Sequence, residues 1–361
     1  MSSLRKIRDR IKSVSATRQM TASMKLIAVL RLKKKHASFL QTVPFADEMN
    51  RVIRRLVRSL KQKQQLSDKP DARLSLPKLL HGNGKDKRYV VVMITSDEGL
   101  SGASQIQVAT HTRKLIDYLL GEEKEVHVFA YGTRGTSLLQ RFYPDLPIIS
   151  LKQKKTTDLT AYLNAERITA TIIESFHKDR FDVCLFVYNR FKSVVSQVPT
   201  VEQLIPNKIF LKENPWDFLS TAPDEDYRRT NAVGQKKISL KKSSFLSAIG
   251  GAEALPSLQE TIFKTDIDTG KRLPDSYDYE PSDTTLLEAV LPQYLTAYVY
   301  RVLLEASVSD NAARLMAMDN ASHNAGDMLS RLDRTYRRTR QTRITTDIAE
   351  VFTGTIQEGA S

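Results

Sequence analysis

The sequence predicts an α/β fold: a Rossmann-like domain with a mostly parallel sheet, joined to a long antiparallel coiled coil of N- and C-terminal helices. Residues 1–60 and 282–361 keep the 3–4 spacing of apolar residues that is typical of coiled coils. Residues 89–206 instead alternate short β-rich runs with helical stretches, which indicates a parallel sheet with helices on its faces. Two helices folded back over a globular core are the alternative arrangement of the same segments.

The N-terminal segment, residues 1–60, is expected to be one long helix with a break near Pro44. Coiled-coil spacing occurs on both sides of this proline, at Ile7, Ile11, Val14, Thr17, Thr21, Met24 and Ala28, and at Ala46, Met49, Ile53, Leu56 and Leu60.

Positive charge is concentrated in the same segment. Residues 1–60 hold fifteen Lys and Arg against three acids, whereas residues 283–361 hold eight Arg against ten acids. A basic surface of this kind indicates nucleic acid, anionic lipid or an acidic protein surface as a partner, and charge alone does not choose among them.

Residues 89–206 carry the α/β pattern. Strands are expected at 89–95, 125–131, 147–151 and 181–189, with helices near 103–120, 134–142 and 158–177, and one further strand within 193–206. Residues 61–88 read as a polar loop insertion, and residues 207–281 as an insertion of uncertain order that adds little to the core.

The C-terminal segment, residues 282–361, is expected to be a helix roughly 110 Å long at 1.5 Å per residue. The stretch NAARLMAMDNASHNAGDML (311–329) keeps helical period with unusually small side chains. Six Arg follow within residues 331–343, opposed only by Asp333. Arginine suits bidentate contacts to carboxylates, so this part fits a rod enclosed by acidic or polar walls. The 3–4 alternation here comprises Leu315, Met318, Ser322, Ala325, Leu329, Leu332, Tyr336 and Thr339, and resumes one residue out of register at Ile344.

No catalytic, cofactor or metal site is predicted. The turn SDEGLSGA (96–103) lacks both phosphate-loop patterns, and the six histidines form no metal-ligand spacing. Asp97 and Glu98 are expected to be solvated, and Cys184 and His127 to be packed within strands. One cysteine excludes an internal disulfide, no run is long enough to cross a bilayer, and the N-terminus shows no secretory or transit pattern.

Both terminal segments resemble the gamma-subunit family of F-type ATP synthases. The resemblance rests on IRDRIKSVSATRQMTASMKLIAVLRLKKKH, on AARLMAMDNASHNAGDML with TYRRTRQTRITTDIAEVFTG, on TSDEGLSGA, and on LLEAVLPQYLTAYVYRVLLEA. It covers residues 1–60, 89–206 and 276–357, and leaves 61–88 and 207–275 as insertions.

The resemblance implies a non-catalytic central-stalk rotor subunit without cofactors. Such a subunit couples proton-driven rotation of the membrane c-subunit ring to ATP synthesis in the alpha and beta subunits, and it binds the epsilon subunit (delta in mitochondria). It associates with the membrane only through the complex: at the cytoplasmic face of the cell inner membrane, or at the matrix face in mitochondria. The implied partner contacts are Met24, Lys25, Arg340, Gln341, Val351 and Phe352.

Two other functions remain open on the residues alone. A basic coiled-coil protein could bind nucleic acid through residues 1–60, although Phe39 and Phe45 are the only aromatics there for stacking. An α/β enzyme with helical extensions would need a catalytic constellation, which the sequence does not show. The resemblance itself implies no nucleic-acid partner.

Overall fold

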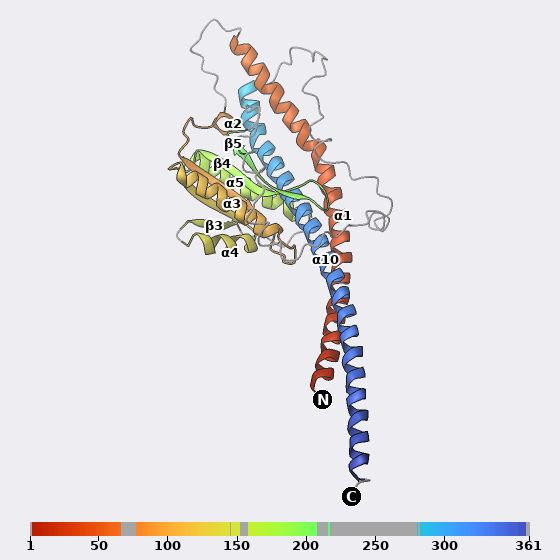
Figure 1. Ribbon diagram of the computed structural model, residues 1–361. Helices are drawn as coiled ribbons and strands as arrows, with labels where there is room; N and C mark the ends of the chain where they lie inside the picture. The colour runs from red at the N-terminus through yellow and green to blue at the C-terminus, as the bar shows by residue number, and fades with distance from the viewer. Residues whose placement is uncertain are drawn as a thin grey trace. The chain divides into compact units, whose positions relative to one another are not determined.

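The computed structural model describes residues 2–65, 77–144, 146–151, 158–207, 216, 280 and 282–358 (Figure 1). Its contacts divide the chain into two compact units, which we call the helical unit (residues 1–31 and 314–361) and the sheet unit (Leu32–Ala313). The elements in chain order are α1 (Ser2–Gln65), α2 (Lys78–His81), β1 (Arg88–Ile94), α3 (Ser104–Gly121), β2 (Glu125–Tyr131), α4 (Thr133–Phe142), β3 (Ile148–Leu151), α5 (Asp158–His177), β4 (Val183–Phe191), β5 (Gln197–Ile205) and α10 (Asp283–Glu358).

The sheet has five strands in the order β3-β2-β1-β4-β5. Strands β1 to β4 are parallel, and β5 runs antiparallel to β4, with Val187 opposite Val201. Their β-branched and aromatic runs are the residues that pack best on a pleated, buried surface. The predicted mostly parallel sheet is therefore confirmed, and so is the expected strand after β4.

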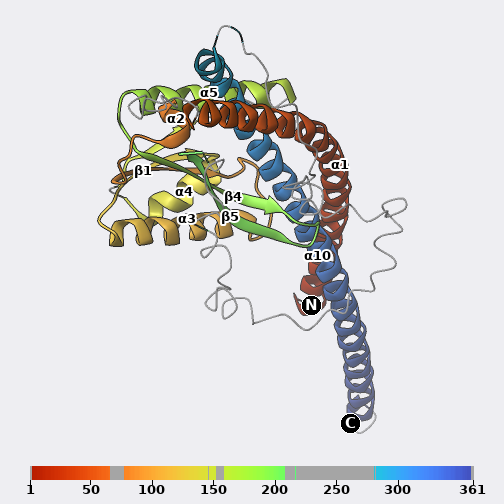
Figure 2. The same ribbon diagram turned by 90° about the horizontal axis from the view of Figure 1, so that it is seen from above.

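Side chains alternate between the two faces of this sheet, and helices cover both faces. Val91, Met93 and Leu185 face α3 and α4, whereas Val92 and Phe186 face the opposite layer. That second layer consists of α5, the later part of α1 and the early part of α10 (Figure 2). The terminal helices thus contribute directly to the core of the sheet unit.

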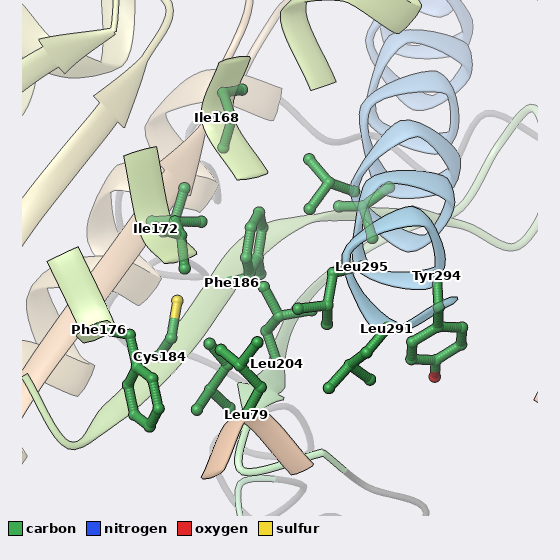
Figure 3. Close-up of a cluster of buried hydrophobic side chains, with 14 of the residues drawn as sticks. Leu79, Ile168, Ile172, Phe176, Cys184, Phe186, Leu204, Leu291, Tyr294 and Leu295 are labelled. Carbon is green, nitrogen blue, oxygen red and sulfur yellow. The ribbon is translucent and has the colours of Figure 1, made fainter. Parts of the chain in front are cut away.

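The core of the second layer is shown in Figure 3. Ile172 of α5 and Leu291 and Leu295 of α10 lie around Phe186 of β4, and Cys184 lies in the same cluster. Cys184 is fully buried, and burial raises the pKa of its thiol. It is therefore a core residue, as the sequence predicts.

The later part of α1 differs from the sequence prediction at Pro44 and agrees with it at the apolar positions that follow. The helix continues through Pro44 without the predicted break. Pro44 is exposed while Val43 and Ala46 are buried, so packing on the opposite face holds the helix together although the proline lacks an N–H donor. Ala46, Ile53, Leu56 and Leu60 are buried as their spacing predicts, and the last three pack into the sheet unit's core.

Two features of the predicted insertions differ from expectation. Helix α2 lies inside the stretch 61–88 that we expected to be a loop, because Leu79 and Leu80 bury against the core. Trp216 is also a core residue, lying edge-on to Tyr89 and Tyr118 with ring centroids 6.2 Å away in both cases. Trp216 is thus one core residue from a stretch, 207–275, that we expect to add little to the core, and for the rest of that stretch the expectation stays a prediction. Residues 66–76, 208–215, 217–279 and 281 lie outside the described part.

The turn after β1 is a structural junction. The Oδ1 atom of Asp97 accepts a hydrogen bond of 2.7 Å from the backbone N–H of Thr133, so this exposed acid caps the start of α4 as well as being solvated. Gly132, just before α4, has φ +99°, and a Cβ there would lie 2.2 Å from the carbonyl oxygen of Thr95. Only glycine permits this close approach of α4 to the end of β1.

We predict that Gly132→Ala destabilises the chain by at least about 1–3 kcal/mol, because it adds backbone strain to a steric clash. The measurement is urea unfolding followed by circular dichroism. Gly121→Ala is the matched control, since a Cβ at the last residue of α3 meets no atom within 4 Å and should be neutral or slightly stabilising. Equal unfolding midpoints for the two variants would contradict the prediction.

Candidate partner-contact site on the helical unit

Helices α1 and α10 pair antiparallel in the helical unit, as predicted (Figure 1). The Nζ atom of Lys25 lies 2.6 Å from Oδ1 of Asp319, and Gly326 lies against Arg18, whose Cζ is 3.7 Å from the place a Cβ would occupy. In both contacts the two residue numbers add to 344. This constant sum is the antiparallel register of the pair, since a residue earlier on α1 lies opposite a residue correspondingly later on α10.

The predicted seam of α10 is confirmed. Leu315, Met318 and Ala325 are buried, and the remaining seam positions, Ser322, Leu329, Leu332, Tyr336 and Thr339, are all half-buried. On α1 the seam includes half-buried Met24 and buried Ala28. Thr17 is exposed, so the predicted α1 seam is wrong at that position.

Beyond this seam, α10 is uncovered in the chain alone. Every residue from 341 to 350 is exposed, including Ile344 at 47% and Ile348 at 51%. The register explains the limit, since α1 begins at Ser2 and the same register places that residue opposite Thr342. The heptad that resumes at Ile344 therefore does not pack against α1.

The hydroxyl groups of both helices are largely satisfied within their own helix. Thr335, Thr342 and Thr346 each donate to the carbonyl four residues earlier, at 3.0–3.1 Å. Thr17 and Ser23 of α1 donate in the same way at 3.0 and 3.1 Å. These donors are used internally, so the surface they form is polar but has few strong directional contacts to offer.

The partner-contact residues expected from the resemblance fall into two patches. Met24 is half-buried on α1 beside Lys25, whose side chain is 34% exposed and already paired with Asp319. Arg340 and Gln341 are exposed on α10. By the register, residue 24 lies opposite residue 320, so the two patches are separated by roughly 30 Å along the pair at 1.5 Å per residue. Val351 and Phe352 lie within α10, and their side chains are outside the described part.

Sequence reasoning missed an exposed apolar patch on α1. Met20, Leu26, Ile27 and Leu30 are 60, 68, 50 and 69% exposed. The signal was present, because these large apolar residues lie off the seam while smaller residues such as Ala28 occupy it. A helix that buries its small residues and exposes its large ones offers its outer side to another partner.

Metal-ligating groups do not gather into a site in the part of the chain that is described. No group of three or more His, Cys, Asp or Glu residues there could hold a metal ion. His127 is half-buried in β2 with Nε2 3.0 Å from Oε1 of Glu125, so it is a strand residue with a local partner. Among the described helices, none is long and apolar enough to cross a membrane.

The chain combines a sheet unit of the α/β class with a helical unit in which two long helices pair antiparallel. The sequence pattern of the ATP synthase family matches residues 3–356, and the chain belongs to the gamma chains of that family. It is 32% identical to the ATP synthase gamma chain of Granulibacter bethesdensis and 30% identical to that of Pelagibacter ubique, in each case over 98% of this chain and 99% of the relative.

A solved structure shares the fold. One chain of the Euglena gracilis mitochondrial ATP synthase (OSCP/F1/c-ring, rotational state 3) superposes with a TM-score of 0.50 at 16% identity, covering 99% of this chain and 95% of that chain. Membership of the gamma-chain family favours the rotor expectation over the nucleic-acid-binding and enzyme alternatives.

We predict that Ala325→Trp lowers the free energy of unfolding by about 1–3 kcal/mol, because it overpacks a buried position between two helices. Helix axes only about 8–10 Å apart leave no room for an indole. Asn324→Trp, at the neighbouring exposed position, is the control. Thermal unfolding by circular dichroism measures both, and equal melting temperatures would show that Ala325 does not limit the packing.

Proposed function

We propose that this chain is the central-stalk rotor subunit of an F-type ATP synthase, coupling proton-driven rotation of the c-subunit ring to ATP synthesis in the alpha and beta subunits. The chain itself is non-catalytic and needs no cofactor. The observation that carries the proposal is the uncovered end of α10, a single helix whose residues 341–350 are all exposed in a chain that belongs to the gamma chains.

The surface of the helical unit suits rotation inside a sleeve. A shaft has to pass similar walls without being held by any one of them. On the outer surface, hydroxyls that bond within their own helix and scattered apolar side chains leave few directional contacts that could hold the shaft. The exposed Ile344 and Ile348 would be covered by the alpha and beta subunits, which supports an enclosing partner rather than a flat one.

The two patches have different roles in this proposal. Arg340 and Gln341 would bond a loop of the beta subunit, and Met24 and Lys25 would contact its moving lever. Lys25 already pairs with Asp319, so its charge is partly neutralised and a beta-subunit carboxylate would have to compete for it. Val351 and Phe352 would form the apolar tip that seats at the top of the sleeve.

The sheet unit would bind the epsilon subunit (delta in mitochondria) and rest on the c-ring. Association with the membrane would then occur only through the complex, at the cytoplasmic face of the cell inner membrane or the matrix face in mitochondria. The absence of a membrane-spanning helix among the described residues is compatible with this placement. Nucleic acid is not a partner in this proposal.

The test is reconstitution of the chain with alpha and beta subunits of a bacterial ATP synthase. We expect a stable complex that hydrolyses ATP. Arg340→Ala combined with Gln341→Ala should leave the isolated chain folded but sharply lower ATP hydrolysis and synthesis. Removing one half of a buried charged contact costs about 2–5 kcal/mol, and this contact must form and break during turnover.

Arg334→Ala is the matched control. Its guanidinium is exposed on the same helix and donates to the carbonyl of Ser330 at 3.2 Å, so its loss should change activity little. Unchanged activity of the double variant in an intact complex would show that this pair is merely solvated. Failure of the unmodified chain to assemble with alpha and beta subunits would overturn the rotor proposal itself.

A further inference from the structure

From Tyr294 to Ala313, within the sheet unit, α10 is enclosed on all sides. No residue from Tyr294 to Ala313 is exposed, and apolar residues such as Leu295, Val299 and Val302 are fully buried. Burial of apolar surface is non-directional. A helix that is buried all round therefore gains no single preferred angle about its own axis from the hydrophobic effect alone.

One stripe of this enclosed helix is polar. Tyr298, Arg301 and Glu305 are spaced three and four residues apart, which places them on the same side of α10. They meet Glu202 of β5 and two residues of β4, Tyr188 and Arg190. We call these six residues the buried charge cluster.

Glu202 is the centre of the buried charge cluster. Its carboxylate accepts hydrogen bonds from the hydroxyl of Tyr298 and from Nη2 of Arg190, and its Oε2 lies 3.4 Å from Nη2 of Arg301. Glu305 completes the group, because its Oε2 accepts a hydrogen bond of 3.3 Å from the Tyr188 hydroxyl and its Oε1 lies 3.8 Å from Nε of Arg190.

The cluster is deeply buried and its charges balance. The side chains of Glu202 and Glu305 are 3 and 4% exposed, and that of Arg301 is 15% exposed. Two carboxylates face two guanidinium groups. Burial raises the pKa of Glu305, while Arg301 and Arg190 oppose that rise. Burial also raises the pKa of Tyr298, and the charge of Glu202 adds to this effect.

Stability alone does not account for such a group. A buried ion pair is often no more stable than apolar residues of similar volume, because removing charges from water is costly. What the group adds is a preferred angle of α10 about its own axis, since hydrogen bonds and the planar guanidinium require defined geometry. Turning α10 by one residue, about 100°, would move all three of its cluster residues away and leave buried charges unpaired.

We propose that the buried charge cluster is a rotational clamp, which holds α10 at one angle on strands β4 and β5 so that torque on α10 reaches the sheet unit without slip. The proposal rests on the proposed function, in which α10 turns as a shaft. Its six residues act by positioning the helix.

The first test measures the angle of α10 directly in the isolated full chain. Spin labels are placed at two exposed sites, Glu122→Cys after α3 and Gln293→Cys on α10; Cys184 is buried and does not compete for the label. Glu202→Gln should broaden the distance distribution between the labels. Glu288→Gln, the same change at an exposed position of α10, should leave it unchanged.

The second test uses the complete reconstituted ATP synthase in vesicles. With Glu202→Gln we expect ATP hydrolysis to continue near the unmodified rate while protons pumped per ATP hydrolysed fall, because α10 still turns but drives the sheet unit less faithfully. Glu288→Gln should keep both values. Equal losses of hydrolysis and pumping would indicate general damage and overturn the clamp, as would unchanged distances with unchanged pumping.

A milder variant decides the matter if Glu202→Gln does not fold. Tyr298→Phe removes one hydroxyl and leaves both carboxylates and both guanidinium groups in place. A smaller broadening with a smaller loss of pumping supports the clamp, and wild-type values overturn it. Failure of the unmodified chain to assemble would count against the rotor proposal, whereas the distance measurement on the isolated chain would still judge the clamp.

Discussion

The antiparallel register of α1 on α10 decides which part of the last helix is available to a partner. It is fixed where Lys25 meets Asp319 and where Arg18 lies against Gly326. Shifting it by one turn would change the length of α10 that α1 covers by about 5.4 Å. This register also places the candidate contact residues: Arg340 and Gln341 lie where the covered seam ends, and residues 342–350 are exposed.

The composition of α10 changes along its length in step with its surroundings. Large apolar residues such as Leu291 and Val302 occupy the part within the sheet unit, where they fill the core. Small residues such as Ala325 follow in the part that pairs with α1. Polar and cationic residues dominate after Tyr336, toward the end of the part that α1 covers. The two parts of α10 could not change places. The large apolar residues would then be exposed beside α1, and the small residues would leave cavities in the core of the sheet unit.

Periodicity predicted the parts of this structure in which one neighbour dominates. The seam from Leu315 to Thr339 and the strands of the sheet follow directly from 3.6- and 2-residue periods. Periodicity did not identify what the partner is. Ile53, Leu56 and Leu60 have coiled-coil spacing but pack in a core built from the sheet, α5 and α10. The spacing reports which side of a helix is covered, not by which element.

Other features depend on contacts between residues far apart in sequence. Pro44 leaves the helix intact because tertiary packing outweighs one missing donor. Trp216 joins the core from a stretch without periodicity, and Glu202 meets Arg301 across about a hundred residues. The candidate contact residues came from resemblance, since an exposed Arg340 is physically like its exposed neighbours. Charge at a solvated helix face becomes specific only when a partner buries it.

A shaft whose outer surface offers few directional contacts has a mechanical consequence for the other end of the same helix. A surface that passes its neighbours easily cannot itself resist rotation, so resistance has to come from elsewhere along α10. Burial of apolar surface is itself non-directional, whereas the hydrogen bonds among the carboxylate and guanidinium groups around Glu202 require defined angles. The cost of burying those charges is therefore understandable where the helix is enclosed.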